Sequence, residues 1–564
     1  MSNADQKIDQ DASQQTAASL GDAAARPSIW ELALPSILGN LSYTIVGMVQ
    51  TKFVGELGPQ ALAAVGAGQR VMFAMLAVLM AVSAGTTALV ARAWGAGDYQ
   101  EASRVTMASL VLGGGLAAVV AVLGFVFAGS LAGVFGLDDE TLAMATRNIR
   151  WLSFFNIAFA GMLILSAALR ASGDAWSPLW IADGINVLNL PLLYAFIFWR
   201  WGMTEMGVAG AAVAAGIAFS LGTLVLLTLW VRQKFRVRHV TGGWWRRARL
   251  RQLVDIGYPA ALEQGVFQLG FFIFLIVIGN SYGTEAFAAY NIGVNILAVC
   301  MTVGFGFSIA GSTLVGQHLG AKDFAGAARS GWRSMWLAIV SMGCIGVGVM
   351  FYAEALAEYF IGTGALTIEY TVQFIYVLGA MMPLLAVEFA IGGALRGAGD
   401  TRFPLITTIL GLLVMRCGLA AIAAYLGLPV IWVYAALIGD YVLKGVMLIW
   451  RFRQGRWKTI IPENPTYGCR VLRVSGKKTN RCGRPIRARC DTSRAGHQEA
   501  RCLRVSRRRC CWFGLKPETQ CSTPAGVESP RRVLARCDDK TVSRQRAQWC
   551  RHPRQRSCSE TAQP

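Results

Sequence analysis

The chain has 564 residues, of which 54% are hydrophobic, with a mean hydropathy of +0.45 and a formal net charge of +21. Soluble domains are about 45–50% apolar on a comparable count, so this composition excludes an ordinary water-soluble globular protein. The apolar excess lies between about residue 30 and residue 451, in blocks long enough to cross a bilayer.

Twelve apolar blocks follow one another along this part of the chain. They cover residues 30–54, 67–93, 104–128, 148–170, 179–200, 207–231, 255–279, 288–315, 331–352, 368–394, 403–426 and 430–450. A membrane-spanning helix needs about 20 mostly apolar residues, which each block supplies. None of them alternates polar and apolar residues as the strands of a membrane barrel do. The prediction is therefore twelve transmembrane helices.

The two ends of the chain differ from this apolar region. Residues 1–27 are polar and lack the basic start and short apolar core of a signal peptide, so we expect a disordered cytoplasmic tail. Residues 459–564 are basic and rich in cysteine: within them, 464–564 hold 24 Lys or Arg against 7 Asp or Glu, and 10 of the 13 Cys. This tail has no apolar period that could build a core and no C-x-x-C pair that would favour zinc. We expect it to be disordered.

The origin of this basic tail has two readings. A shifted reading frame in GC-rich DNA would give its bias toward Arg, Cys and Pro, and this is the preferred interpretation. A genuine disordered basic tail is the alternative, and an Arg-rich tail of this kind could bind RNA. Under the preferred interpretation no nucleic-acid partner is expected.

Basic residues indicate how the chain is oriented. Short cytoplasmic loops collect Lys and Arg, and the longest linker, residues 232–254, is the most basic. Its cations are Arg232, Lys234, Arg236, Arg238, Arg246, Arg247, Arg249 and Arg251. This linker is therefore predicted to be cytoplasmic. Six spans on either side of it then place both termini in the cytoplasm, with the spans in the cell's inner (plasma) membrane.

The sequence repeats itself at a spacing of about 225 residues. Gly95-Ala96-Gly97-Asp98 recurs as Gly320-Ala321-Lys322-Asp323, and Leu169-Arg170-Ala171-Ser172-Gly173-Asp174 recurs as Leu395-Arg396-Gly397-Ala398-Gly399-Asp400. Several such segments agree in order, which makes chance a poor explanation. The repeat divides the apolar region into two similar halves.

Each half, residues 28–231 and residues 255–458, holds six predicted spans. Because an even number of spans returns the chain to the same side, the halves are parallel repeats about an axis along the membrane normal. The predicted fold is an all-α membrane protein with two six-helix bundles related by pseudo-two-fold symmetry. Rocking of one bundle against the other would give alternating access.

These features together resemble one transporter family. The six-plus-six spans, the segment Phe53-Val54-Gly55-Glu56-Leu57-Gly58, the two Gly-Ala-x-Asp loops and the segment Leu395–Thr401 are similar to the multidrug and toxic compound extrusion (MATE) family, over residues 28–458. The resemblance implies a secondary antiporter that exports organic cations or other toxic small molecules in exchange for H⁺ or Na⁺. It implies no cofactor beyond that ion, and a monomer in the lipid bilayer is expected.

The N-terminal half departs from the family at its ion site. Members of the family often carry Asp-Thr where this chain has Gln50-Thr51, and an Asp where Leu193 stands. Both acids of the usual site are therefore absent. Gln50 and Asn189 remain as candidates for cation coupling, with Asp183, about two turns before Asn189, as a substitute acid. Asp183 could instead lie near the cytoplasmic end and simply be hydrated.

Two carboxylates of the C-terminal half are further coupling candidates. A charge at mid-membrane costs about 2.5–3.5 kcal/mol, so each one suggests a function. Glu263 lies four residues after Pro259, which frees a backbone carbonyl one turn back, and Glu388 follows another proline. The acids typical of the family would stand about one turn away, at Phe267 and Leu385. Glu263 could instead be a packing carboxyl that pairs with a neighbouring span.

Other candidates are structural or belong to the substrate cavity. Asp440 and Lys444 are four residues apart on one helix, so a neutralising structural pair is expected. Aromatic and polar side chains that could face a substrate cavity are Tyr43, Phe267, Phe271, Tyr290, Asn291 and Phe389. Core packing is the alternative for each of these six.

Competing function classes find less support. The sequence contains no G-x-x-x-x-G-K-[ST] loop, as an ATP-driven pump would have, and its four histidines, His239, His318, His497 and His552, fall in loops or the tail. Neither an enzyme nor a metal site is therefore expected. The nearest rival is a flippase for lipid-linked saccharides, which would line its cavity with Arg or Lys to hold phosphates.

Overall fold

The structure is a computed structural model, and it describes residues 27–198, 206–361 and 365–460. The predictions for residues 1–26 and 461–564 lie outside the described residues. Within the described residues, twelve helices are long and apolar enough to cross a membrane. Each of the twelve apolar blocks overlaps one of them, so the predicted all-helical fold is confirmed.

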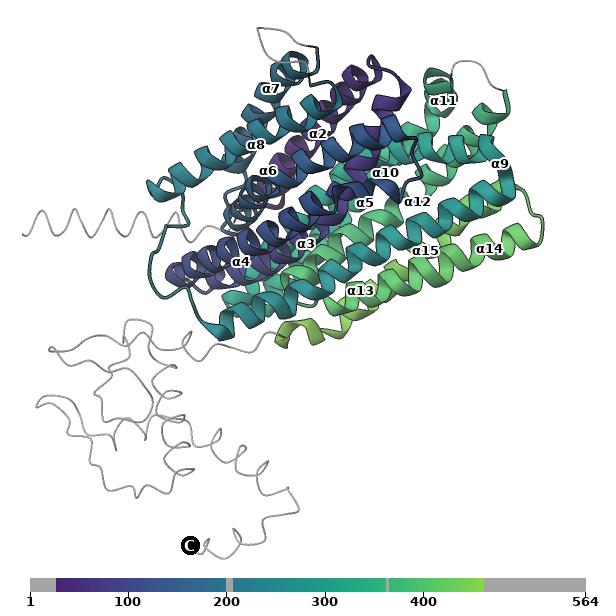
Figure 1. Ribbon diagram of the computed structural model, residues 1–564. Coiled ribbons are helices and arrows are strands. Elements are labelled where there is room, and N and C mark those ends of the chain that lie inside the picture. Colours follow the sequence, from purple (N-terminus) through teal and green to yellow (C-terminus); the bar gives the residue numbers. More distant parts are fainter. Residues whose placement is uncertain (1–26, 199–205, 362–364, 461–564) are drawn as a thin grey trace, which may run out of the picture. The chain divides into compact units, whose positions relative to one another are not determined.

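Figure 1 shows the spanning helices lying side by side. The helices of the N-terminal half are α2 (Ile29–Gly55), α3 (Pro59–Gly95), α4 (Tyr99–Val126), α6 (Asp139–Ala171), α7 (Trp176–Ile197) and α8 (Val208–Val231). Those of the C-terminal half are α9 (Arg247–Gly320), α10 (Phe324–Phe351), α12 (Ala365–Gly397), α13 (Arg402–Thr408), η1 (Ile409–Arg416), α14 (Cys417–Tyr425) and α15 (Val430–Gln454). Short helices α5 (Ala128–Gly133), α11 (Ala353–Ile361) and η2 (Arg456–Thr459) complete the set.

Four of these elements do not correspond to one span each. Helix α9 contains two spans, because Gly283 interrupts it with a φ of 80°, a value that glycine adopts without strain. The eleventh span is built from α13, η1 and α14 in succession, and η1 is a π-helix. The seventh span begins at Arg247, so the helix includes the last part of the linker that was predicted over residues 232–254.

The repeated loops close in the same way in both halves. Asp98 caps α4 by accepting a hydrogen bond from Glu101 N at 2.9 Å, and Asp323 caps α10 by accepting one from Gly326 N at 2.8 Å. The residues just before these caps, Gly97 and Lys322, both have a left-handed φ, of 74° and 63°. The repeat seen in the sequence is therefore a repeat of local structure.

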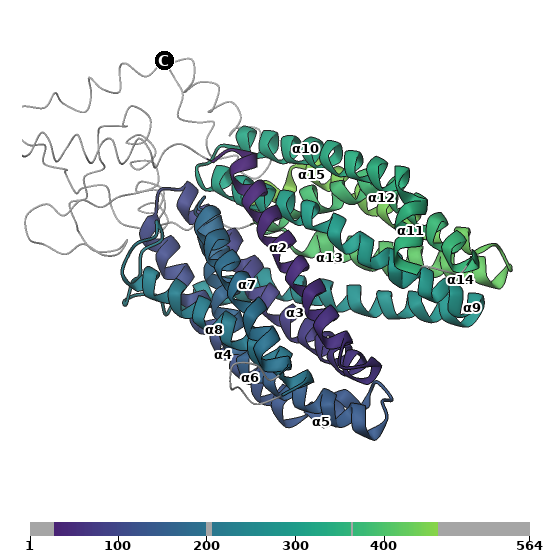
Figure 2. The ribbon, with the colours of Figure 1, turned by 90° about the horizontal axis from the view of Figure 1, so that it is seen from above.

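The two halves form two groups of helices within the described residues. In Figure 2 the purple-to-blue helices α3–α8 lie together, and the teal-to-green helices α9–α15 lie together. Helix α2 contacts α7 of its own half and also α9 of the other half. Helix α3 packs along α9, so these two helices form much of the contact between the bundles.

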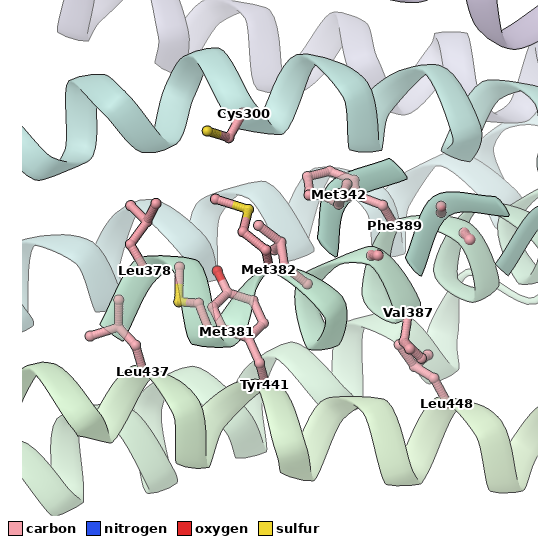
Figure 3. Packing of buried hydrophobic residues seen from close by; sticks show 14 of the residues in the cluster. Cys300, Met342, Leu378, Met381, Met382, Val387, Phe389, Leu437, Tyr441 and Leu448 are labelled. Atoms are coloured by element: carbon pink, nitrogen blue, oxygen red, sulfur yellow. The ribbon is translucent and has the colours of Figure 1, made fainter. Parts of the chain in front are cut away.

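The largest hydrophobic core lies in the C-terminal bundle and fixes α12 against α15. Figure 3 shows Leu378, Met381 and Met382 of α12 close to Leu437 and Tyr441 of α15. All five side chains are at most 2% exposed. This packing holds the register of the two helices and so decides which polar groups on them face each other.

Candidate transport site

A cavity of about 90 Å³ lies inside the N-terminal bundle, between α2, α3, α6 and α8. Its polar and aromatic lining consists of Tyr43, Gln50, Gln69, Asn148, Phe155, Phe159 and Phe219. None of the described residues that line it is an Asp, Glu, Lys or Arg. The cavity therefore offers amide groups and aromatic rings to a ligand, and no formal charge.

Two of the predicted candidates, Tyr43 and Gln50, line this cavity. Phe219 lies beside Tyr43 and Phe159, with ring centroids 6.5 and 4.7 Å away. Asn148 donates its amide to Val208 O at 3.0 Å, which leaves its Oδ1 buried without a hydrogen-bond partner in the described part of the chain. Gln69 and Asn148 were not predicted, although polar amides inside apolar spans were a usable signal.

The other N-terminal candidates lie on α7, away from the lining of this cavity. Asn189 is 4% exposed, and Asp183 is half-buried. Among the described residues, neither Asn189 Oδ1 nor Asp183 Oδ1 has a hydrogen-bond partner. The structure therefore does not bring Asp183 and Asn189 together with Gln50 around one cavity.

Four charged side chains meet inside the C-terminal bundle, and we refer to Glu388, Arg416, Asp440 and Lys444 as the charge network. Arg416 Nη2 lies 2.5 Å from Asp440 Oδ2, and Lys444 Nζ lies 3.2 Å from Asp440 Oδ1. Lys444 Nζ is also 3.4 Å from Glu388 Oε1. The side chains of Arg416, Asp440 and Lys444 are 4%, 0% and 1% exposed, whereas that of Glu388 is 24% exposed.

The charge network is neutral as a whole, which explains how it can be buried. An isolated charge in an apolar interior is very unfavourable, and removing one partner of a buried pair typically costs about 3–5 kcal/mol. Tyr441 adds to the stabilisation, because its ring centroid lies 5.2 Å from Arg416 Cζ and 5.0 Å from Lys444 Nζ. Cations over an aromatic face are attracted by the ring quadrupole.

Local backbone structure makes room for the charge network. The π-helix η1 ends at Arg416, and such π segments are rare and often found at functional sites. A Cβ at Gly411 of η1 would overlap Asp440 Oδ1 and would lie 2.7 Å from Lys444 Cγ. Gly411 is therefore required for α15 to approach η1 this closely. The apolar pattern of the eleventh span gave no signal for this.

Glu263 is paired across two helices. Its Oε1 lies 2.9 Å from Arg396 Nη1 of α12, and the two side chains are 15% and 24% exposed. Arg396 belongs to the repeated segment Leu395–Asp400. Glu263 therefore makes the contact with a neighbouring span that was the alternative to a coupling role.

The remaining cavity candidates divide by burial. Tyr290 is 2% exposed and packs against Phe274, with ring centroids 5.3 Å apart, and Phe389 is 8% exposed and packs against another ring of α9. Phe267, Phe271 and Asn291 are half-buried. Tyr290 and Phe389 are therefore packed in the hydrophobic core, which was the alternative for all six candidates.

Within the described residues, twelve helices long and apolar enough to cross a membrane form two repeated bundles, and each bundle holds buried polar groups, an arrangement typical of multi-pass membrane transporters. The MatE family model matches residues 35–195 and again residues 259–422, together more than half of the chain. The chain therefore belongs to the MatE family. The two matches fall one in each half, in agreement with the repeat seen in the sequence.

Named relatives match this chain over most of their own length. A "Probable multidrug resistance protein NorM" of Thermotoga maritima is 29% identical over 77% of this chain and 93% of its own length. An "Uncharacterized transporter YisQ" of Bacillus subtilis is 23% identical over 76% of this chain and 94% of its own.

Solved structures share the fold. An "Outward-facing conformation of a multidrug resistance MATE family transporter of the MOP superfamily" aligns with a TM-score of 0.71 and 23% identity, covering 76% of this chain and 96% of that one. A MATE protein crystallised in complex with MaL6 aligns with a TM-score of 0.72 and 22% identity, covering the same shares.

Proposed function

We propose that this chain is a secondary antiporter that exports small, flat organic cations, drugs among them, in exchange for H⁺ or Na⁺. Membership of the MatE family supports transport, and the relatives named as multidrug resistance proteins support export of toxic compounds. The observation that carries the coupling part is the position of Glu388 at the least buried end of the charge network.

The lining of the N-terminal cavity suits an organic cation, and the cavity of about 90 Å³ must widen to take a drug-sized one, since pockets for such ligands measure about 300–1,000 Å³. Aromatic faces attract organic cations by about 0.5–2 kcal/mol, more when the contact is desolvated. Tyr43, Phe159 and Phe219 supply such faces, and the amide oxygens of Gln50 and Gln69 can accept hydrogen bonds from a ligand.

The charge network suits the proposed coupling. A carboxylate that exchanges an ion must reach water in at least one conformation, and Glu388, 24% exposed, is the least buried carboxylate of the charge network. Asp440 is fully buried between two cations, so it stays fixed while Glu388 changes its partner. Export would follow if the state of Glu388 biases which side of the membrane the N-terminal cavity faces.

The contact between the bundles supports alternating access. Near their carboxyl ends α3 and α9 pack backbone to backbone: a Cβ at Gly95 would lie 2.6 Å from Gln317 Cα, and one at Gly320 would lie 2.8 Å from the carbonyl carbon of Arg92. These two contacts are equivalent under the repeat. One end of the molecule is therefore closed by a symmetric crossing that must open for transport.

We propose that this closed end faces the cytoplasm, with both termini on the same side of an inner membrane and the protein acting as a monomer. The basic linker lies at this end and is anchored there. Arg249, 4% exposed, donates to both carboxylate oxygens of Glu101 at 2.8 and 2.7 Å, and to the carbonyls of Gly243 and Trp244. The positive-inside rule then gives the orientation.

A flippase for lipid-linked saccharides remains the alternative. Such a protein needs basic side chains that are free to hold phosphates. The two cations of the charge network are each engaged by a carboxylate, Arg416 by Asp440 and Lys444 by Asp440 and Glu388. This arrangement favours cationic cargo over anionic cargo.

Accumulation of ethidium in living cells tests the proposal. Cells that express the chain should accumulate less dye than cells with an empty vector, and Glu388→Gln should abolish the difference. Glu369→Gln is a matched control, because Glu369 lies on the same helix α12 and is exposed. If cells with the wild-type chain at the membrane hold as much ethidium as control cells, export of organic cations is refuted.

A further inference from the structure

Lys444 holds a position between two carboxylates that come from different helices. Its ammonium lies 3.2 Å from Asp440 Oδ1 on α15 and 3.4 Å from Glu388 Oε1 on α12, and the side chain is 1% exposed. Two carboxylates that both lie within 3.4 Å of one position need a cation there, because two negative charges repel each other strongly in apolar surroundings. The chain itself supplies that cation.

The Lys444 ammonium competes with any free cation for this position. Alkali and alkaline-earth ions bind to clusters of oxygen ligands, and here both oxygens of Asp440 are already engaged, by Arg416 and by Lys444. A sodium ion would therefore have to displace an ammonium that is tethered to α15. A tethered group competes at an effective concentration of millimolar or higher, without loss of translational freedom.

A proton competes in a different way. It binds to a Glu388 oxygen covalently and needs no set of ligands, and Glu388, 24% exposed, is the least buried member of the charge network. When Glu388 is protonated, its attraction to Lys444 is lost, while Lys444 keeps its pairing with Asp440. The network can thus gain and lose a proton without being dismantled.

We propose that Lys444 is a built-in counter-cation that takes the place of a sodium ion in the C-terminal bundle, so that protons and not sodium ions drive transport. This inference rests on the antiport proposed above and selects its coupling ion.

The groups around Glu388 and Lys444 identify Glu388 as the site of protonation. The charged and titratable side chains that act on these two or on their partner Arg416 are Asp440 and Tyr441 of α15, Arg416 of η1, Cys417 of α14, and Glu263 and Tyr290 of α9. Glu263 is itself neutralised by Arg396 of α12. Asp440 lies between two cations, Arg416 and Lys444. Glu388 is the carboxylate of the charge network with one ion-pair partner and the less buried side chain.

The charge network is a built site and not a chance meeting of side chains. It draws on three elements, α12, η1 and α15, and it requires a bare Cα at Gly411. Arg416, the last residue of the π-helix, contacts Asp440 Oδ2, and Lys444 contacts the other carboxylate oxygen, Oδ1.

Purified full-length protein provides the test, in two independent measurements. The first is the unfolding temperature in NaCl and in choline chloride at equal ionic strength. Wild type and Lys444→Arg, which keeps a cation, should give the same value in both salts. Lys444→Gln removes the cation, and its unfolding temperature should be higher in NaCl. A wild-type protein that is stabilised by NaCl relative to choline chloride overturns the inference, whatever the transport assay gives.

The second measurement is ethidium transport by wild-type protein in liposomes. An imposed pH gradient in sodium-free choline buffer should drive uptake, and a sodium gradient at equal pH should not. Transport under the sodium gradient alone overturns the inference and leaves the antiport function standing. Transport under neither gradient refutes the proposed function, on which the inference depends. Both arms use the wild-type chain, so a variant that fails to fold does not remove the test.

Discussion

Gly95→Ala should push the two bundles apart at their closed end. In the structure a Cβ at Gly95 would lie 2.6 Å from Gln317 Cα, whereas unstrained carbon–carbon contacts are about 3.5–4.0 Å. Helices α3 and α9 would therefore have to separate by roughly 1 Å. Overpacking of this kind costs about 1–3 kcal/mol, and it is felt only in the conformation in which the helices cross here.

The population of the two access states should shift accordingly. A penalty of about 1–3 kcal/mol on the closed end corresponds to a change of about 5- to 150-fold in the ratio of states. Spin labels at Gln100 and Ala325, exposed and equivalent positions at the starts of α4 and α10, would report it by pulsed electron resonance in a background without other cysteines. The fraction with a long label–label distance should rise in Gly95→Ala.

A matched control separates this effect from a general effect of alanine. Gly114 lies inside α4 with nothing within 4 Å of its Cβ position, so Gly114→Ala gains helix propensity of about 1 kcal/mol and meets no contact. Its distance distribution should equal that of wild type. If Gly95→Ala also leaves the distribution unchanged, the crossing of α3 and α9 is not the gate that the account requires.

Three further variants test the anchoring of the linker, the charge network and the cavity. Arg249→Ala removes two hydrogen bonds to the Glu101 carboxylate, which keeps only the more distant Arg104 at 3.9 Å, and two hydrogen bonds to the carbonyls of Gly243 and Trp244. Hydrogen bonds to charged groups contribute about 1.5–3 kcal/mol, so the unfolding temperature should fall. Arg251→Ala breaks a pair whose side chains are 84% and 53% exposed and should change stability by at most about 0.5 kcal/mol. Asp440→Asn leaves two buried cations, Arg416 and Lys444, without their shared carboxylate. It should lower the free energy of unfolding, measured by chemical denaturation, by about 3–5 kcal/mol, which is more than Glu388→Gln should lower it, because the Glu388 side chain is 24% exposed. Phe219→Ala removes one aromatic face from the N-terminal cavity and should weaken ethidium binding by about 1 kcal/mol, or roughly fivefold, in a fluorescence titration. An unchanged affinity would show that ethidium does not bind in this cavity.

The sequence predicts the fold well because membrane spans are set by composition. Each span must satisfy its backbone within a helix of about 20 apolar residues, so hydropathy and the 225-residue repeat give the twelve helices and their two bundles. Helix ends are less determined. Arg249 shows why: the seventh helix begins among basic linker residues, because buried contacts with Glu101 stabilise its first turn.

The candidate site was predicted only in part. Spacing along one helix is enough to place Lys444 beside Asp440, because residues four apart share a face. The participation of Glu388 and Arg416 depends on how three helices pack, and on a π-helix with a bare glycine at Gly411. Neither has a periodic signature in the sequence. Glu263 likewise found its partner in Arg396, 133 residues away, through packing alone.

The pH dependence of ethidium binding tests the central claim most directly, namely that protonation of Glu388 and binding of an organic cation oppose each other. If binding of the ligand releases one proton from the protein, the ligand binds more weakly at lower pH. Its dissociation constant then rises by up to about tenfold for each pH unit of decrease. Fluorescence titration of the purified protein should show this rise in wild type and in Glu369→Gln, and a flat profile in Glu388→Gln. A dissociation constant that is independent of pH in wild type, or that keeps its full pH dependence in Glu388→Gln, would contradict the account.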